Sequence, residues 1–270
     1  MGVSAIGSST DYLYGKMAAG KRIQTAADDA AGLSIAHKLL KENNGLDVGA
    51  SNIRDSIGAV NVMDGALGTM QDSLQRIREL SVKSMNGLYG DSERKMIQNE
   101  IDQLMEDVQR SAVGTQYNQL KLLDGSMADM HVASNPDGTG MKLGMENVTL
   151  QNLGIGGYNV TGKFSLDDID VAIDRISRAR SRAGAATNAM EHAYNYNKRA
   201  SQELTGSRSR IEDLDMPKAV SEQKKNRLMQ DYRLGMMRSQ TQDGSMVLKF
   251  FQNMSRCRRE EQNYTLTFAG

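Results

Sequence analysis

An apolar side chain recurs at intervals of three and four residues through much of the first half of the chain. The positions are Ile53, Ile57, Val60, Met63, Leu67, Met70, Leu74, Ile77 and Leu80. This spacing lines one face of an α-helix, so it predicts a long helix that packs through this face and ends near Met85, before Asn86-Gly87. A helix of about 40 residues is about 60 Å long. Because such a helix cannot fold back on itself, it needs a second long helix as its partner.

The second half of the chain offers that partner. A similar stripe with smaller side chains consists of Ile169, Ile173, Ile176, Ala183, Ala186, Met190, Ala193 and Ala200. It predicts a helix that opens near Ser165 or Asp167, and its small residues allow the helix axes to approach closely. A shorter helix with Asp91 or Ser92 as N-cap carries Ile97, Ile101, Leu104 and Val108. A last helix begins after Pro217 and carries Leu228, Met229, Tyr232, Met236 and Met237.

The middle of the chain, residues 124–163, has a different character. Turn signals occur at Asp124-Gly125, at residues 136–140 and at residues 154–157, and residues 148–150 and 158–161 suit short strands. We therefore predict a mainly α fold. The N- and C-terminal flanks form a long antiparallel helical rod or coiled coil. A small β-hairpin region in the middle caps the rod at the end far from the termini.

Composition agrees with long helices and argues against several partners. There are 2 Pro and no Trp, whereas Met reaches 18. Lys plus Arg and Asp plus Glu are both 33, so the zero net charge gives no support for nucleic acid or a membrane as partner. No run of about 18 apolar residues predicts a transmembrane helix, and residues 1–9 lack the pattern of a signal peptide. Cys257 is expected to be a free thiol.

No enzymatic site is predicted. The segment 157–163 fits Gly-x-x-x-x-Gly-Lys, but Phe164 stands where a phosphate-binding loop needs Ser or Thr. We interpret it as a hairpin turn, with a nucleotide-binding enzyme as the alternative. The histidines His37, His131 and His192 lie far apart, so no metal or cofactor is expected. The basic face formed by Arg175, Arg178, Arg180 and Arg182 is interpreted as a solvated or intersubunit face.

Four segments resemble the bacterial flagellins, in that family's order. The longest is residues 19–36, whose core Asp28-Asp29-Ala30-Ala31-Gly32 follows a turn at Gly20 and contains paired acids suited to capping a helix. The others are residues 74–80, residues 114–118 together with 122–125, and a C-terminal hinge that contains Arg210, Ile211, Glu212 and Asp213. The segment before Gly20 is shorter than is usual in the family, and residues 252–270 extend beyond its usual apolar ending.

The resemblance implies a structural subunit of the flagellar filament, not an enzyme. Residues 1–29 and 221–270 would form the terminal coiled coil and residues 30–220 the rod domain, with its hairpin region at 124–163. The implied partners are further copies of the chain, an export chaperone, the type III export apparatus, and the hook-associated and cap proteins. The implied location is extracellular, reached without a cleaved signal peptide. A hook–filament junction protein and a minor flagellin acting as a receptor ligand are the alternatives.

The resemblance also suggests recognition by a host Toll-like receptor. Some flagellins present an arginine, a leucine and a glutamate to that receptor from the inner rod. The matching positions here are Arg76, Leu80 and Asp107. Asp107 is one methylene shorter than the family's glutamate. Structurally, Arg76 could equally be a solvated helix charge and Leu80 a seam residue.

Overall fold

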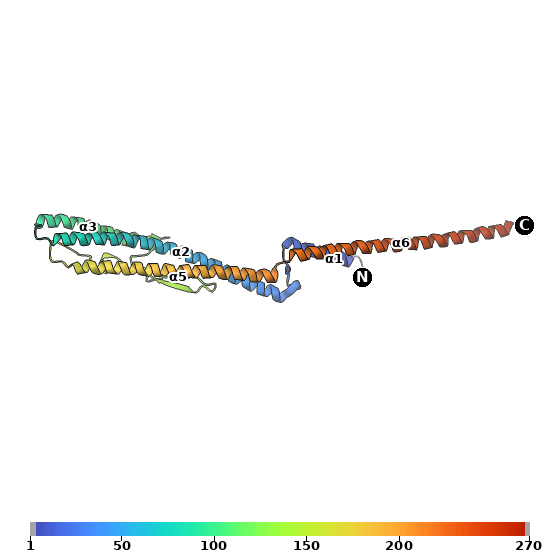
Figure 1. The fold of residues 1–270 in the computed structure, drawn as a ribbon, viewed down its shortest axis with the longest axis horizontal. Coiled ribbons are helices and arrows are strands. Elements are labelled where there is room, and N and C mark those ends of the chain that lie inside the picture. Colours follow the sequence, from blue (N-terminus) through green and yellow to red (C-terminus); the bar gives the residue numbers. More distant parts are fainter. Residues whose placement is uncertain (1–3, 268–270) are drawn as a thin grey trace. The chain divides into compact units, whose positions relative to one another are not determined.

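The computed structural model describes the backbone of residues 4–267, and the side chains of residues 12–239, 246 and 249 (Figure 1). In chain order the elements are α1 (Ser4–Ala19), α2 (Ala26–Ser84), α3 (Asp91–Gly114), β1 (Gln116–Tyr117), β2 (Leu120–Lys121), β3 (Asp129–Ala133), β4 (Gly140–Gly144), α4 (Leu150–Leu153), α5 (Leu166–Glu212) and α6 (Met216–Thr267). Long helices therefore flank a short region of two-stranded antiparallel sheets. The predicted fold class is confirmed.

The chain forms two compact units. Unit 1 comprises Met1–Ala36 and Arg208–Gly270, and unit 2 comprises His37–Ser207. In unit 2, α2 and α5 run antiparallel, side by side, and α3 packs beside α2 (Figure 1). In unit 1, α1 contacts α6.

The apolar stripes predicted from spacing form the core of unit 2. From α2 the fully buried members are Ile53, Val60, Met63, Leu67, Met70, Leu74, Ile77 and Leu80, whereas Ile57 is partly buried. From α5, Ile169, Ile176, Ala183 and Met190 are buried, and Ala172 and Ala179 add further small residues that the stripe did not include. Burying this much apolar surface in one continuous seam is the main source of the unit's stability.

Polar pairs fix the register of α2 against α5. Asp47 pairs with Lys198, Asp64 with Arg180, and Arg78 with Asp170, and the guanidinium of Arg54 lies over the ring of Tyr194. In each pair the two residue numbers add up to between 244 and 248, as expected of two antiparallel helices without a register shift. These pairs are exposed, so each contributes little to stability, but together they favour one alignment.

The strands lie at positions other than those predicted. β3 and β4 pair antiparallel, from Asp129 opposite Gly144 to Ala133 opposite Gly140. The predicted strands at 148–150 and 158–161 are wrong. Their apolar side chains Val148, Tyr158 and Val160 are buried in the helical core, and Asn147 and Asn159 accept backbone N–H groups two residues on, which folds each segment into a turn.

The hairpin does not cap the far end of the rod, so that expectation is wrong too. The side chains of Asn52 on α2 and Asn197 on α5 donate hydrogen bonds to the carbonyls of Ala133 (3.0 Å) and Ser134 (2.7 Å). A Cβ atom at Gly49 would lie 2.3 Å from the carbonyl oxygen of Ser134. The hairpin thus lies along the side of α2 and α5, and the connection between α2 and α3 forms the end of unit 2 that lies away from His37 and Ser207.

Helix ends agree with expectation in part. α5 begins at Leu166, and α6 begins at Met216 with Pro217 in its first turn, as predicted. The N-cap of α3 is Gly90, and no side chain caps this end, so the assignment to Asp91 or Ser92 is wrong by one or two positions. Asp91 instead lies in the first turn, where a carboxylate complements the helix dipole.

Candidate self-assembly surfaces

The segments 20–25 and 211–215 lie against each other in unit 1, and we call them the neck. The backbone turns at Gly20, whose φ is +67°, a value that favours glycine. The N–H groups of Arg22 and Ile23 then donate to the carbonyl of Glu212, at 2.7 and 3.4 Å, and the N–H of Leu214 donates to the carbonyl of Gly20 at 2.9 Å. Two sequence segments that are far apart are therefore joined by backbone hydrogen bonds.

Asp28 connects α1 to the start of α2. Its carboxylate lies 3.0 Å from Nζ of Lys16 on α1, and its side chain is only 5% exposed. The same carboxylate accepts hydrogen bonds from the N–H groups of Gln24 (2.9 Å) and Thr25 (3.0 Å). A buried carboxylate with this many donors is well satisfied, so the neck is organised around it.

Asp29 caps the helical part of α2 that follows it. Its backbone is non-helical (φ −164°, ψ 97°), and its Oδ1 accepts the N–H of Gly32 at 2.9 Å, as an N-cap residue does. A Cβ at position 32 would lie 2.4 Å from Oδ2 of Asp29 and 2.8 Å from Cδ1 of Ile23. The capping function expected of the acidic pair is confirmed for Asp29 alone, since Asp28 accepts N–H groups of residues 24 and 25 instead. The geometry at Asp29 also explains the glycine at position 32.

The C-terminal hinge residues face cations that the sequence did not single out. Glu212 pairs with Lys21 at 2.5 Å, and the carbonyl of Ile211 accepts from the guanidinium of Arg22 at 2.7 Å. Asp213 accepts from the hydroxyl of Ser209, and Arg210 lines a shallow groove of unit 1. Lys16, Lys21 and Arg22 were missed, although three cations within seven residues could have indicated partners for distant acids.

Beyond the neck, α6 exposes a stripe of large apolar side chains, and we call it the α6 stripe. Leu228 is 72%, Tyr232 63% and Met236 53% exposed. Met246 on the same face and Met229 at its edge are exposed as well, whereas Met237, also exposed, lies on the opposite side of the helix. A run of exposed apolar residues on one helix indicates a surface that another surface covers.

α1 is too short to run along the whole length of this stripe. It has 16 residues against 52 in α6, which correspond to about 24 and 78 Å. Tyr12 and Leu13 of α1 line a groove with Ala219 and Asn226, close to the start of α6. Most of α6 therefore extends past the helix that packs against it.

The three positions that match the receptor motif all make contacts within unit 2. The guanidinium of Arg76 contacts Glu100 at 2.8 Å and Glu79 at 3.1 Å, and these hydrogen bonds, that of Glu100 first, raise the pKa of Arg76. Leu80 is buried, at 3% exposure, and Asp107 pairs with Arg110 at 3.1 Å. Arg76 and Asp107 are exposed, whereas Leu80 belongs to the core.

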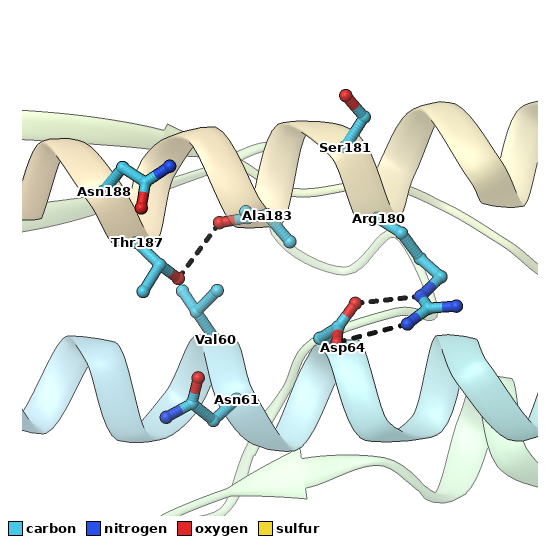
Figure 2. Close-up of a pocket in the computed structure, with 9 residues that line it drawn as sticks. Val60, Asn61, Asp64, Arg180, Ser181, Ala183, Thr187 and Asn188 are labelled. Atoms are coloured by element: carbon cyan, nitrogen blue, oxygen red, sulfur yellow. Dashed lines mark hydrogen bonds and ion pairs between the residues drawn. The ribbon is translucent and has the colours of Figure 1, made fainter.

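The basic face of α5 is largely satisfied by the chain itself. Figure 2 shows Arg180 in a shallow depression between α2 and α5, where its Nε lies 3.0 Å from Oδ1 of Asp64. The guanidinium of Arg175 donates to the carbonyl of Asn152, and that of Arg182 pairs with Glu146. The depression is lined by short side chains such as Ala183 and Thr187. These observations agree with an ordinary helix face rather than an anion-binding groove.

The remaining candidate sites do not assemble in the part of the chain that the structure describes. Residues 157–163 form turns with no helix opening at Lys163, unlike a phosphate-binding loop. Among the described residues, no three His, Cys, Asp or Glu side chains gather as a metal site would require. None of the described helices combines the length and the apolar character needed to cross a bilayer. Cys257 and the tail side chains after Phe251 lie outside the described side chains.

The long antiparallel helices, the hydrogen-bonded terminal segments and the exposed apolar side chains of α6 define a mainly helical protein built from paired long helices. Two family profiles match the chain. The bacterial flagellin N-terminal helical region matches residues 5–128, and the bacterial flagellin C-terminal helical region matches residues 166–251. The chain belongs to the bacterial flagellin family.

Individual proteins show the same similarity. A flagellin of Halalkalibacterium halodurans is 31% identical over 242 residues, which cover 87% of this chain and 89% of that protein. The flagellar filament 30.7 kDa core protein of Treponema maltophilum is 28% identical over 267 residues, or 90% and 93% of the two chains. The crystal structure of Bacillus cereus flagellin superposes with a TM-score of 0.49 at 24% identity, covering 54% of this chain and 88% of that one.

Proposed function

We propose that this chain is a core subunit of an extracellular bacterial flagellar filament, and that it polymerises through its paired terminal helices. The observation that carries the proposal is the α6 stripe, because α1 leaves it uncovered in the single chain. In a polymer, terminal helices of neighbouring subunits would cover it, and the buried apolar area would drive assembly. The role is structural, not enzymatic.

In this proposal the terminal segments and the middle of the chain have separate tasks. Residues 1–29 and 221–270 form the inner coiled coil of the filament, and residues 30–220 form the rod domain, with its hairpin region at 124–163. Asp28, Asp29, Gly32 and the segment Arg210–Asp213 would act as assembly residues, because they hold the neck and the neighbouring ends of α1 and α2 in place. Their hydrogen bonds and ion pairs support this role.

Electron microscopy of the purified protein tests the proposal. Clarified subunits are mixed with short filament seeds, with and without a precipitating salt, and filament length is measured over time. We expect long filaments from the wild type and few from a variant with Tyr232→Ser and Met236→Ser. Val62→Ser on α2, which also replaces an exposed apolar residue, is the matched control. Wild-type subunits that stay monomeric with intact helical circular dichroism would contradict the proposal.

Family membership also suggests partners for export and for the filament ends. We propose an export chaperone that holds the C-terminal region, passage through the type III export apparatus, and contacts with hook-associated and cap proteins. Immunogold labelling distinguishes the main subunit, which decorates the whole filament, from a hook–filament junction protein, which labels one end only.

Recognition by a Toll-like receptor is a second proposal, supported by the exposed position of Arg76 on α2. The hydrogen bonds from Arg76 to Glu100 and Glu79 would have to be exchanged for hydrogen bonds to the receptor. Leu80 is buried, so it would act indirectly, by holding Arg76 in position. A receptor reporter assay should therefore show a weaker response for Arg76→Ala and a stronger one for Glu100→Gln. Absence of any response to the wild-type monomer would remove this role.

A further inference from the structure

Asparagine is followed directly by glycine twice in the chain, at Asn44-Gly45 and at Asn86-Gly87. In such a pair the backbone nitrogen of the glycine can attack the side-chain amide of the asparagine, because glycine has no Cβ to hinder the approach. Both asparagines are exposed, so access of water does not distinguish the two pairs. The backbone around them differs, and this difference determines which pair can react.

Asn86-Gly87 lies in the connection between α2 and α3, residues 85–90, which is neither helix nor strand. The side-chain Oδ1 of Asn86 accepts the N–H of Leu88 at 3.1 Å. This hydrogen bond closes an Asx turn, a ring that contains both Cγ of Asn86 and the backbone nitrogen of Gly87. The turn therefore brings the two reacting atoms near each other. The N–H on Oδ1 also stabilises the negative charge that develops on this oxygen during the attack.

The backbone nitrogen of Gly87 is available as the nucleophile. Within the part of the chain that the structure describes, its N–H donates no hydrogen bond. Gly87 is exposed, and a Cβ atom at this position would meet no atom within 4 Å. The next residue, Leu88, is 89% exposed. The space around the connection thus allows the backbone rotation that ring closure needs.

Asn44-Gly45, by contrast, lies inside α2. The N–H of a residue within a helix donates to the carbonyl four residues earlier, and the helical ψ angle is fixed, so the nitrogen at position 45 cannot turn towards the side chain of Asn44. The hairpin covers this position as well, because a Cβ at Gly45 would lie 2.5 Å from Cβ of Pro136. The helix would have to open locally before this pair could react.

We propose that Asn86 is a site of spontaneous deamidation, whereas the folded chain protects Asn44. In the first step the bond between the nitrogen of Gly87 and Cγ of Asn86 forms, and the bond between Cγ and Nδ2 breaks. The proton of the glycine N–H passes through solvent to Nδ2, which leaves as ammonia, and a cyclic imide remains. Water then opens the imide at either carbonyl, which gives aspartate or isoaspartate. Water is the only co-reactant, and nothing is oxidised or reduced.

The products change the end of α2. A carboxylate at position 86 lies just beyond the C-terminal carbonyls of α2, where the helix dipole disfavours negative charge. Isoaspartate also adds a methylene to the main chain, so the Asx turn to Leu88 is lost. The last turn of α2 should therefore exchange its amide hydrogens faster in the modified chain. This modification lies outside the proposed filament function and does not rest on it.

Peptide mapping of the full chain tests the proposal. The protein is kept at about pH 8 or about pH 6 and then digested with trypsin at mildly acidic pH. Mass spectrometry follows the peptides of residues 84–94 and 42–54, which contain the two pairs. We expect aspartate and isoaspartate to form in the first peptide at least about tenfold faster than in the second, which requires local opening. The rate should be higher at the higher pH, because the nitrogen must lose its proton.

A denatured control and two variants assign the difference to the fold. In guanidinium chloride both pairs should react at similar rates, since neither backbone is then fixed. Gly87→Ala fits without a clash and should slow the reaction at least about tenfold, because the new Cβ hinders the attack. The matched control Gly157→Ala alters another exposed turn glycine with open space around it and should leave the rate unchanged.

Three results would overturn the proposal. They are equal rates at the two pairs in the folded chain, an unmodified Asn86 after the time in which guanidinium chloride converts it, and an unchanged rate in Gly87→Ala. Seeded growth of freshly purified protein reports on the proposed filament function separately, so failure of one proposal is distinguishable from failure of the other.

Discussion

Unit 2 and unit 1 are both built from long helices, but different interactions stabilise each unit internally. In unit 2 the apolar faces of α2, α3 and α5 meet, and residues such as Leu67, Leu74 and Ile77 are completely buried. In unit 1 the polar neck holds α1 and α6, while Leu228 and Tyr232 on α6 stay exposed. Unit 2 thus has a continuous apolar core, whereas the part of α6 that carries Leu228 and Tyr232 in unit 1 leaves its apolar side chains exposed. Substitutions in the two units should therefore differ in what they disturb.

The largest effect on folding is expected from a cavity in the seam of unit 2. Leu67→Ala removes a completely buried side chain, so it should lower the free energy of unfolding by about 2–5 kcal/mol. Thermal unfolding followed by circular dichroism measures this. Val62→Ala lies on the same helix but is exposed, and should change stability much less. Equal losses for both variants would mean that unit 2 lacks the tight core described here.

A smaller and local effect is expected in the neck. Asp28→Asn removes the charge that pairs with Lys16 and weakens the hydrogen bonds from residues 24 and 25. The free energy of opening unit 1 should fall by about 2 kcal/mol, while unit 2 keeps its stability. Hydrogen exchange measures both units in one experiment. Faster exchange in the buried part of α2 after Ile53 would show that the substitution also destabilises unit 2, which would contradict the prediction.

A pair of glycines on α2 sharpens the comparison further. Gly32→Ala places a Cβ against Asp29 and Ile23, so it should destabilise unit 1 by about 1 kcal/mol, after the gain in helix propensity. A Cβ at Gly65 in unit 2 meets no atom within 4 Å, so Gly65→Ala should stabilise by up to about 1 kcal/mol. Urea unfolding of the two variants should give changes of opposite sign; the same sign would show that the cap geometry at Asp29 is not tight.

The smallest effect on folding is expected on the α6 stripe. Tyr232→Ser replaces an exposed side chain, so the unfolding free energy should change by no more than about 0.5 kcal/mol. If the stripe serves assembly, the same variant should extend filament seeds more slowly than the wild type. Electron microscopy of seeded growth measures the rate. Normal filament growth together with a clearly lower unfolding free energy would mean that Tyr232 serves folding and not assembly.

Sequence patterns predicted the packing of unit 2 better than the polar contacts of unit 1. The α2 stripe lies in the core because spacing along one helix decides which side chains share a face. The strands could not be placed in this way, because Val148 and Val160 favour strands and buried turns alike. The capping by Asp29 is a local interaction and was foreseen. The pairing of Asp28 with Lys16 depends on where α1 packs, which no local pattern contains.

The paired charges along α2 and α5 also limit how this gene can change in length. Because Asp47, Asp64 and Arg78 each meet a fixed residue of α5, deleting one codon between them would turn the following residues by about 100° and misalign the later pairs. An insertion of seven codons in both helices would preserve the pairing, since it adds about two turns to each. Insertions near Gly138, at the exposed tip of the hairpin, meet no such constraint. Length variation among natural relatives should therefore collect in the hairpin region and spare the paired helices.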